Sequence, residues 1–183
     1  MGRCRTNLIE SMIVRLAERP LLTKFGEFQE VLYYDGQTES IALVMGDVAG
    51  IEDILCRIHS SCISAHVFNS IECECRDEMA AAQALIQKAG NGVIIWLDQE
   101  GKGNGHLALM KSITFKRSGF SQSETYQKAG FAADARSYRP AAGILFDLDV
   151  RSVILLTNNR EKAEDLRKAS TIVSGTRELK TPR

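Results

Sequence analysis

The first stretch of the chain carries apolar residues at helical spacing. Its apolar positions recur every three or four residues and predict an amphipathic helix over residues 6–19. These positions are Leu8, Ile9, Met12, Ile13 and Leu16. Pro20 follows and would end such a helix, because proline lacks the N–H that a helix interior needs. We therefore expect residues 1–19 to form a helical arm that precedes one larger domain, residues 20–183.

A period of two replaces this pattern further along the chain. Residues 25–34 alternate in short steps and include several aromatic side chains, and residues 41–45 form a second apolar run. Asp35 and Gly36 lie between the two runs and mark a tight turn. The combination predicts an antiparallel hairpin. A further strand is predicted at residues 55–59.

Helices and strands alternate in the rest of the chain. Helical spacing predicts helices over residues 78–89, 107–116, 141–147 and 160–168. Continuously apolar runs predict buried strands over residues 93–97 and 153–156. Asp77 is the expected N-cap of the first of these helices, and Gly90 is its expected stop. The pattern favours an α+β fold, whose mixed sheet has an antiparallel N-terminal hairpin and strand-helix alternation in the C-terminal two-thirds.

Composition restricts the partners that this chain can attract. Its 183 residues are enough to bury a substantial apolar core. Lysine plus arginine total 23, as do aspartate plus glutamate, so no overall field draws the protein to nucleic acid or to an anionic membrane. The sequence contains neither a signal-peptide core nor an apolar run of membrane-spanning length. We therefore expect a cytoplasmic protein, in which thiols stay reduced.

Three of the five cysteines form a C-x10-C-x-C pattern. Cys62, Cys73 and Cys75 can supply three thiolates and leave one tetrahedral position for water, which is typical of a catalytic zinc site and of hydrolytic chemistry. On spacing alone, the alternative is three ordinary buried cysteines. A second alternative is a structural site, in which His59 or His66 adds a fourth ligand.

Three further segments carry groups suited to phosphate. Residues 99–105 form a glycine-rich loop with Lys102 between a strand and a helix, where free backbone N–H groups favour an anion. Residues 157–162 likewise leave a strand and enter a helix. In residues 131–138, Asp134 and Arg136 place a carboxylate and a guanidinium two positions apart. Taken singly, these features are also compatible with a tight connection, a helix cap and a surface ion pair.

Five short motifs, in this order, resemble GTP cyclohydrolase II, the zinc enzyme of the first riboflavin step. They are Arg57-Ile-His-Ser-Ser-Cys62, Cys73-Glu-Cys75, Gln99-Glu-Gly-Lys102, Gly130-Phe-Ala-Ala-Asp-Ala-Arg136 and Leu155-Leu-Thr-Asn-Asn159. The resemblance runs from about residue 20 to about residue 179. It implies a homodimer with one zinc ion per chain at the three cysteines, and magnesium bound with the nucleotide triphosphate. The implied reaction is hydrolysis at carbon 8, which opens the imidazole ring of GTP, with release of pyrophosphate.

The resemblance also assigns roles to individual residues. Asp134 resembles the general acid/base of the family, and Arg136 resembles its proposed nucleophile at the α-phosphate. Substrate-binding positions are implied at Arg57, Ile58, His59, Ser60, Ser61, Glu78, Glu100, Gly101, Lys102, Ile113, Gln122, Thr157 and Lys162. The expected partner is a small nucleotide, with no nucleic acid and no membrane.

Some positions depart from the family pattern. Ser61 and Glu78 replace a glutamate and a glutamine, and a carboxylate cannot donate the hydrogen bonds that an amide donates. The alternatives are therefore a hydrolase of a different purine or pyrimidine nucleotide in a specialised pathway, or an inactive nucleotide-binding paralogue. Asp134, Arg136 and the cysteines argue against inactivity. Ile113 replaces a tyrosine, so we expect ring opening with impaired release of formate, and the product is a formamidopyrimidine or a diaminopyrimidine.

Overall fold

The computed structural model describes residues 13–181 and is organised around one mixed sheet of seven strands. Their order across the sheet is β1-β2-β3-β5-β4-β6-β7. The strands are β1 Val14–Thr23, β2 Gly26–Tyr34, β3 Glu39–Met45, β4 Ile54–Ser60, β5 Gly92–Leu97, β6 Val153–Leu156 and β7 Val173–Arg177. Pairing is antiparallel from β1 through β3 to β5, and parallel among β5, β4, β6 and β7. The mixed α+β sheet expected from the sequence is confirmed.

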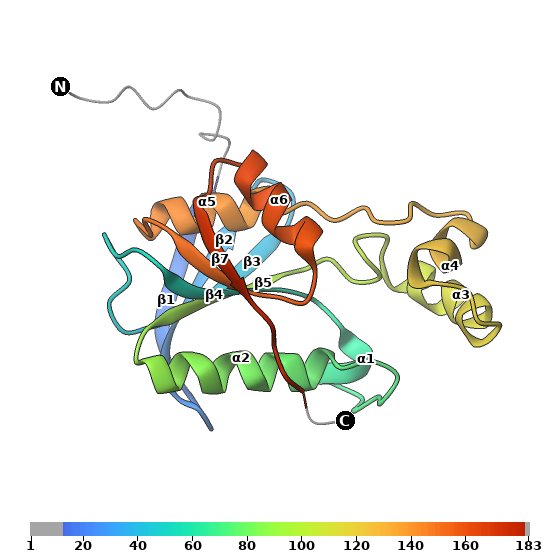
Figure 1. The fold of residues 1–183 in the computed structure, drawn as a ribbon, viewed down its shortest axis with the longest axis horizontal. Helices are drawn as coiled ribbons and strands as arrows, with labels where there is room; N and C mark the ends of the chain where they lie inside the picture. Colours follow the sequence, from blue (N-terminus) through green and yellow to red (C-terminus); the bar gives the residue numbers. More distant parts are fainter. Residues whose placement is uncertain (1–12, 182–183) are drawn as a thin grey trace.

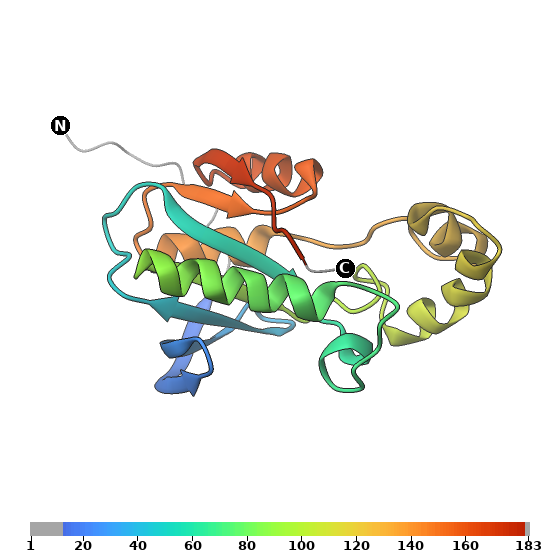
Figure 2. The ribbon, with the colours of Figure 1, turned by 60° about the horizontal axis from the view of Figure 1, so that its bottom comes forward.

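Helices cover both faces of the sheet. Helix α2 (Cys75–Ala89) lies on one face, and α5 (Arg139–Asp147) and α6 (Arg160–Lys168) lie on the other (Figure 1). Helices α3 (His106–Arg117) and α4 (Gln122–Lys128) pack on each other and form a lobe that projects from one end of the sheet (Figure 2). The short helix α1 (Ile63–His66) follows β4 and lies near the start of α2. Within residues 13–181, no helix combines the length and the apolar character that a bilayer span needs.

The central strand β5 shows how the two faces are built. All but one of its residues are buried, as expected for a strand with helices on both sides. Ile94 packs with Ile86 of α2, whereas Ile95 packs in the larger cluster with Ile144 of α5. Because side chains of a strand alternate between faces, the apolar run at β5 joins both cores. This strand and β4 therefore form a rigid base for the loops at their carboxyl ends.

Most predicted elements are confirmed, but the first helix is wrong over the part that the structure describes. Residues 14–19 belong to β1, which pairs with β2 from Val14 to Thr23 apart from a register shift between Arg15 and Ala17. Pro20 is tolerated because β1 is an edge strand with one unpaired side. The expected helical segment at residues 6–12 lies outside the described residues. The division of the chain into an arm and a catalytic domain stays a prediction.

Smaller differences concern the ends of elements and the short ones. Helix α2 begins at Cys75, so Asp77 lies in its first turn and is not its N-cap. Gly90 ends the helix as predicted, with a left-handed backbone. Elements α1, α4 and β7 were not predicted, because four to seven residues are too few to show a period.

Candidate functional site

A cavity of about 470 Å³ lies between the sheet and the α3-α4 lobe. Its walls come from the end of β4, the loop after β5, helices α3 and α4, and Arg136. Strands β4 and β5 are parallel neighbours, so their carboxyl ends lie at the same edge of the sheet. This edge is the usual ligand position in such folds. The volume falls in the range of small-molecule sites.

The three motif cysteines meet at this cavity. Cys62 precedes α1, Cys75 is the first residue of α2, and Cys73 lies just before it. Their sulfur atoms all lie within 4.8 Å of one another, and those of Cys62 and Cys73 are 3.7 Å apart. A tetrahedral zinc ion with Zn–S bonds of about 2.3 Å would place its sulfur ligands about 3.8 Å apart. The donor set and its spacing therefore fit zinc, and none of these cysteines is in a disulfide.

Close packing of the thiols also changes their acidity. Hydrogen bonding from Cys75 lowers the pKa of Cys73 to about 6. The same contact raises the pKa of Cys75, because that thiol keeps the shared proton. A cluster of this kind holds negative charge at neutral pH and is suited to a divalent cation.

The two histidines considered as a fourth ligand contact each other instead. The Nε2 atoms of His59 and His66 lie 2.9 Å apart, with the rings at 74°. Burial, together with the charge of Arg57, lowers the pKa of His59 to about 3, so this imidazole is neutral at physiological pH. Among residues 13–181, the cluster of potential ligand atoms contains the three cysteines and neither histidine.

Asp134 and Arg136 form a two-point ion pair beside the cavity. Nε and Nη2 of Arg136 donate to the two carboxylate oxygens at 2.9 and 2.5 Å. The ammonium of Lys102 lies 4.0 Å from the same carboxylate. Burial raises the pKa of Asp134, but the hydrogen bonds from Arg136 outweigh it and hold the pKa below its usual value. Asp134 is therefore ionised at neutral pH, and Arg136 lines the cavity.

The glycine-rich loop is locked to this ion pair through the backbone. Ala135, which separates the two charged residues, donates its N–H to the carbonyl oxygen of Lys102 at 2.9 Å. Gly103 approaches the same segment so closely that a Cβ atom there would lie 2.8 Å from the carbonyl carbon of Ala135. The glycine-rich loop and the segment of Asp134 and Arg136, which are distant in the sequence, thus act as one structural unit.

Substitution of Gly103 by alanine is expected to disturb this unit. Its φ of +79° disfavours a side chain, and the added Cβ would push Asp134 and Arg136 from their positions. A displacement of about 1 Å can reduce turnover about 100-fold. We expect a loss of this order in kcat/KM with the zinc content unchanged. Gly105→Ala is the matched control, because its φ is +86° but no atom lies within 4 Å of the added Cβ. Equal losses in both variants would refute the steric explanation.

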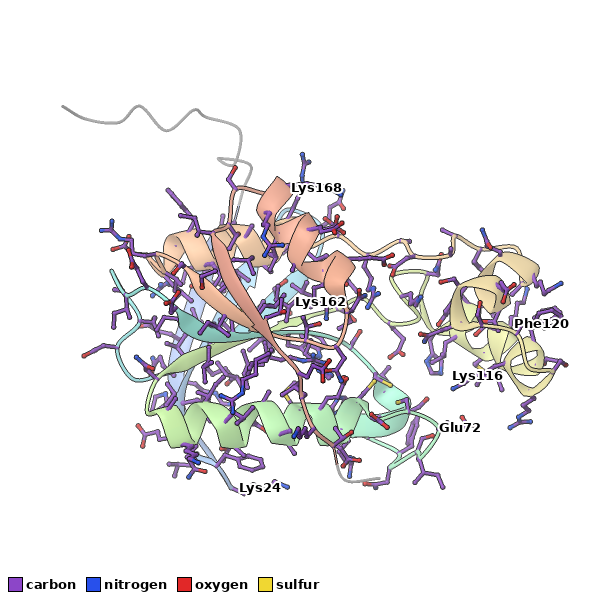
Figure 3. All side chains as sticks on the ribbon, in the orientation of Figure 1. Lys24, Glu72, Lys116, Phe120, Lys162 and Lys168 are labelled. Carbon is purple, nitrogen blue, oxygen red and sulfur yellow. The ribbon has the colours of Figure 1, made fainter. Side chains whose placement is uncertain are left out.

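Glu100 connects the same loop to the cysteine cluster. Its side chain is 8% exposed and accepts a hydrogen bond of 2.8 Å from the backbone N–H of Ile63, the residue after Cys62. The α3-α4 lobe also contacts the cysteine segment: Lys116 of α3 donates to the carbonyl oxygen of Glu72, the residue before Cys73, at 3.0 Å (Figure 3). Both contacts hold the segment that carries the cysteines against other walls of the cavity.

A family model described as GTP cyclohydrolase II matches residues 14–177. The chain belongs to the GTP cyclohydrolase II family. Riboflavin biosynthesis protein RibBA of Bacillus cereus is 40% identical over 159 residues, which cover 86% of this chain and 40% of that protein. RibBA of Chlorobium phaeovibrioides is 38% identical over 157 residues, with 85% and 38% covered. The chain thus spans about two fifths of the length of these relatives.

The fold also matches a solved structure. RibBX, a two-domain 3,4-dihydroxy-2-butanone 4-phosphate synthase from A. baumannii, superposes with a TM-score of 0.53 at 18% identity. The match covers 94% of this chain and 41% of that chain. At this identity the likeness concerns the fold alone.

The cavity brings together many of the site residues expected for GTP cyclohydrolase II, but not all of them. Those that line it are Ser60, Ser61, Cys62, Cys73, Cys75, Glu100, Gly101, Lys102, Ile113, Gln122 and Arg136. Those outside its lining are Arg57, Ile58, His59, Glu78, Asp134, Thr157 and Lys162. The substrate contacts of both sets stay predictions.

Several residues of the second set form a buried cluster beside the cavity of this GTP cyclohydrolase II domain. Arg57 pairs with Glu78 at 2.6 Å, and Lys162 donates to the carbonyl oxygen of Ile58 at 2.9 Å. Lys162 is labelled in Figure 3. Burial and the charges of Arg57 and Arg136 lower the pKa of Lys162 to about 7. The cluster therefore holds closely spaced cations, with Glu78 as their partly compensating charge.

Sequence reasoning missed most cavity residues of the projecting lobe, among them Lys116 and Tyr126. Neither belongs to a motif, and α4 was not predicted at all. The capping box of Ser121 and Glu124 was the available signal for that helix.

Proposed function

We propose that this chain is a zinc-dependent hydrolase that opens the imidazole ring of GTP and releases pyrophosphate. The product is a formamidopyrimidine or a diaminopyrimidine ribonucleotide phosphate. The observation that carries the proposal is that three clustered cysteine sulfurs and the side chains of Lys102 and Arg136 line one cavity. Hydrolysis of the ring needs activated water, which a metal at the cysteines would supply. The triphosphate needs positive charge, which Lys102 and Arg136 supply. A nucleotide triphosphate is a ligand that would use both features.

The residues divide the chemistry between them. Cys62, Cys73 and Cys75 would hold zinc, which supplies Lewis-acid activation of water at neutral pH. Arg136 and Lys102 stabilise negative charge on phosphate oxygens, and magnesium accompanies the triphosphate. Asp134, which Arg136 keeps ionised, takes up a proton. Because the relatives are named riboflavin biosynthesis proteins, we place the reaction in that pathway. We further propose a cytoplasmic homodimer, which the motifs shared with the family imply.

Incubation of zinc-loaded protein with GTP and magnesium, followed by mass spectrometry, tests this proposal. We expect loss of the purine absorbance, one pyrophosphate per GTP consumed, and a pyrimidine product. Chelation of the metal should abolish all three changes. Unaltered GTP after incubation with the loaded protein would refute the proposal.

A second candidate is a hydrolase of a different purine or pyrimidine nucleotide. The cavity wall supports it, because Ser61 places a small hydroxyl where the family has a carboxylate. That hydroxyl donates a hydrogen bond of 3.1 Å to Asp98. A set of nucleotides assayed under the same conditions separates the two candidates. Turnover of another base with no response to GTP would select the second.

A further inference from the structure

The lobe brings to the cavity wall a tyrosine that the motifs do not include. Tyr126 lies on α4, is 1% exposed, and lines the same cavity as the three cysteines. It is the cavity's only tyrosine among the described residues. Its hydroxyl is thus the sole phenolic group that this part of the chain offers to a bound ligand.

The position of Tyr126 is fixed by its helix. Ser121 and Glu124 form a reciprocal capping box, with the Ser121 N–H donating to Glu124 at 2.9 Å. Helix α4 packs on α3, which brings Tyr126 beside Ser112. The Ser112 hydroxyl is itself held in place, because it donates to the carbonyl oxygen of Leu109 at 2.8 Å. A phenol held this way costs little further ordering when a ligand binds.

The surroundings keep this phenol protonated. Burial raises the pKa of Tyr126, and Glu100 and Cys62 raise it further, while Ser112 and Arg136 lower it. The net direction is upward, so the hydroxyl is a hydrogen-bond donor throughout the neutral range. The charges that act on it come from the carboxylate, thiol and guanidinium that surround the proposed reaction site.

The neighbouring wall explains why this hydroxyl matters. Ile113 lines the cavity from α3, one residue after Ser112, and offers only an apolar surface to a ligand. A purine carries acceptor and donor atoms along its edge, and these need polar partners once water is displaced. On the α3-α4 side of the cavity, Tyr126 is placed to provide one.

We propose that the Tyr126 hydroxyl contacts the imidazole edge of the purine base and assists release of formate after ring opening. The inference rests on the proposed function. In that step, water oxygen bonds to the formyl carbon, the bond from carbon to nitrogen breaks, and the nitrogen keeps the electron pair and takes a proton. Formate and an amine result, and the phenol donates a hydrogen bond without being consumed. The apolar residue at position 113 predicted impaired formate release. The proposal changes that expectation, because Tyr126 supplies a hydroxyl that Ile113 lacks.

Tyr126→Phe tests this role while keeping the ring that packs in the lobe. Formate and pyrophosphate are measured for the zinc-loaded wild type and variant with GTP, and GTP binding to the metal-free proteins is measured by calorimetry. We expect GTP affinity to fall by about 2- to 10-fold, the range for one hydrogen bond. Formate released per pyrophosphate should fall at least about 10-fold, with a formamidopyrimidine accumulating. Tyr34→Phe, a substitution on β2, is the control and should match the wild type.

The outcomes separate the inference from the function on which it rests. If the variant binds GTP with wild-type affinity or releases formate in wild-type proportion, the role of Tyr126 is wrong and the proposed function stands. If the wild type opens the ring but releases no formate, the role is likewise wrong. If the wild type leaves GTP intact, both are wrong.

Discussion

Replacement of Cys73 by serine will abolish zinc binding and GTP turnover together. The Cys73 thiol has the lowered pKa of the cluster, about 6, and its sulfur lies 3.7 Å from that of Cys62. Serine keeps the size but removes the thiolate, which is the preferred zinc donor. Loss of a group that only orients a metal ligand typically lowers metal affinity or activity by about 10- to 100-fold. Loss of a metal ligand itself should therefore lower turnover by more than about 100-fold.

A matched control is available in the same chain. Cys56→Ala removes a thiol from β4 that is fully buried and is not among the clustered ligand atoms, and burial raises the pKa of that thiol to about 12. This variant should retain zinc, measured by elemental analysis, and should retain turnover. Cys73 is exposed, so Cys73→Ser is expected to leave the melting temperature of the metal-free protein close to that of the wild type. Normal activity in Cys73→Ser would show that the zinc assignment is wrong.

The cluster of three cysteines could be predicted because its information is local. Cys73 and Cys75 are adjacent in the motif, and the preceding strand fixes where Cys62 lies. The ion pair of Asp134 and Arg136 could be predicted for the same reason, because the two residues are only two positions apart. The α2 and β5 segments were also predicted, because tertiary packing there agrees with the apolar period.

Other features depend on contacts between distant segments and left no pattern to detect. Residues 14–19 form β1 because β2 offers a strand edge, and this pairing overrides their helical spacing. Gly103 is required by the backbone of Ala135, 32 positions later. Tyr126 enters the cavity only because the α3-α4 lobe folds back beside the cysteine cluster. A single sequence shows neither the strand edge nor the lobe.

Arg136→Ala should separate phosphate chemistry from metal binding. Arg136 lines the cavity but is not among the clustered ligand atoms, so zinc content should be unchanged. The substitution removes both side-chain hydrogen bonds to Asp134, which lie at 2.9 and 2.5 Å, and removes a cation from the cavity. Removal of one preorganised electrostatic group typically costs about 100- to 1,000-fold in kcat, and we expect a loss of that size in pyrophosphate release.

Arg136→Lys distinguishes the charge of the side chain from its geometry. Lysine restores a cation but cannot form the two-point contact that the guanidinium makes with the Asp134 carboxylate. If geometry decides, the lysine variant will resemble Arg136→Ala. The pKa of Asp134 will rise part of the way toward its usual value in both, because the two-point side-chain contact is lost while the backbone N–H of residue 136 still donates to the carboxylate. If charge decides, lysine will recover most of the activity, with Lys102 helping to keep Asp134 ionised from 4.0 Å away. Pyrophosphate release at the wild-type rate in Arg136→Ala would remove Arg136 from the mechanism altogether.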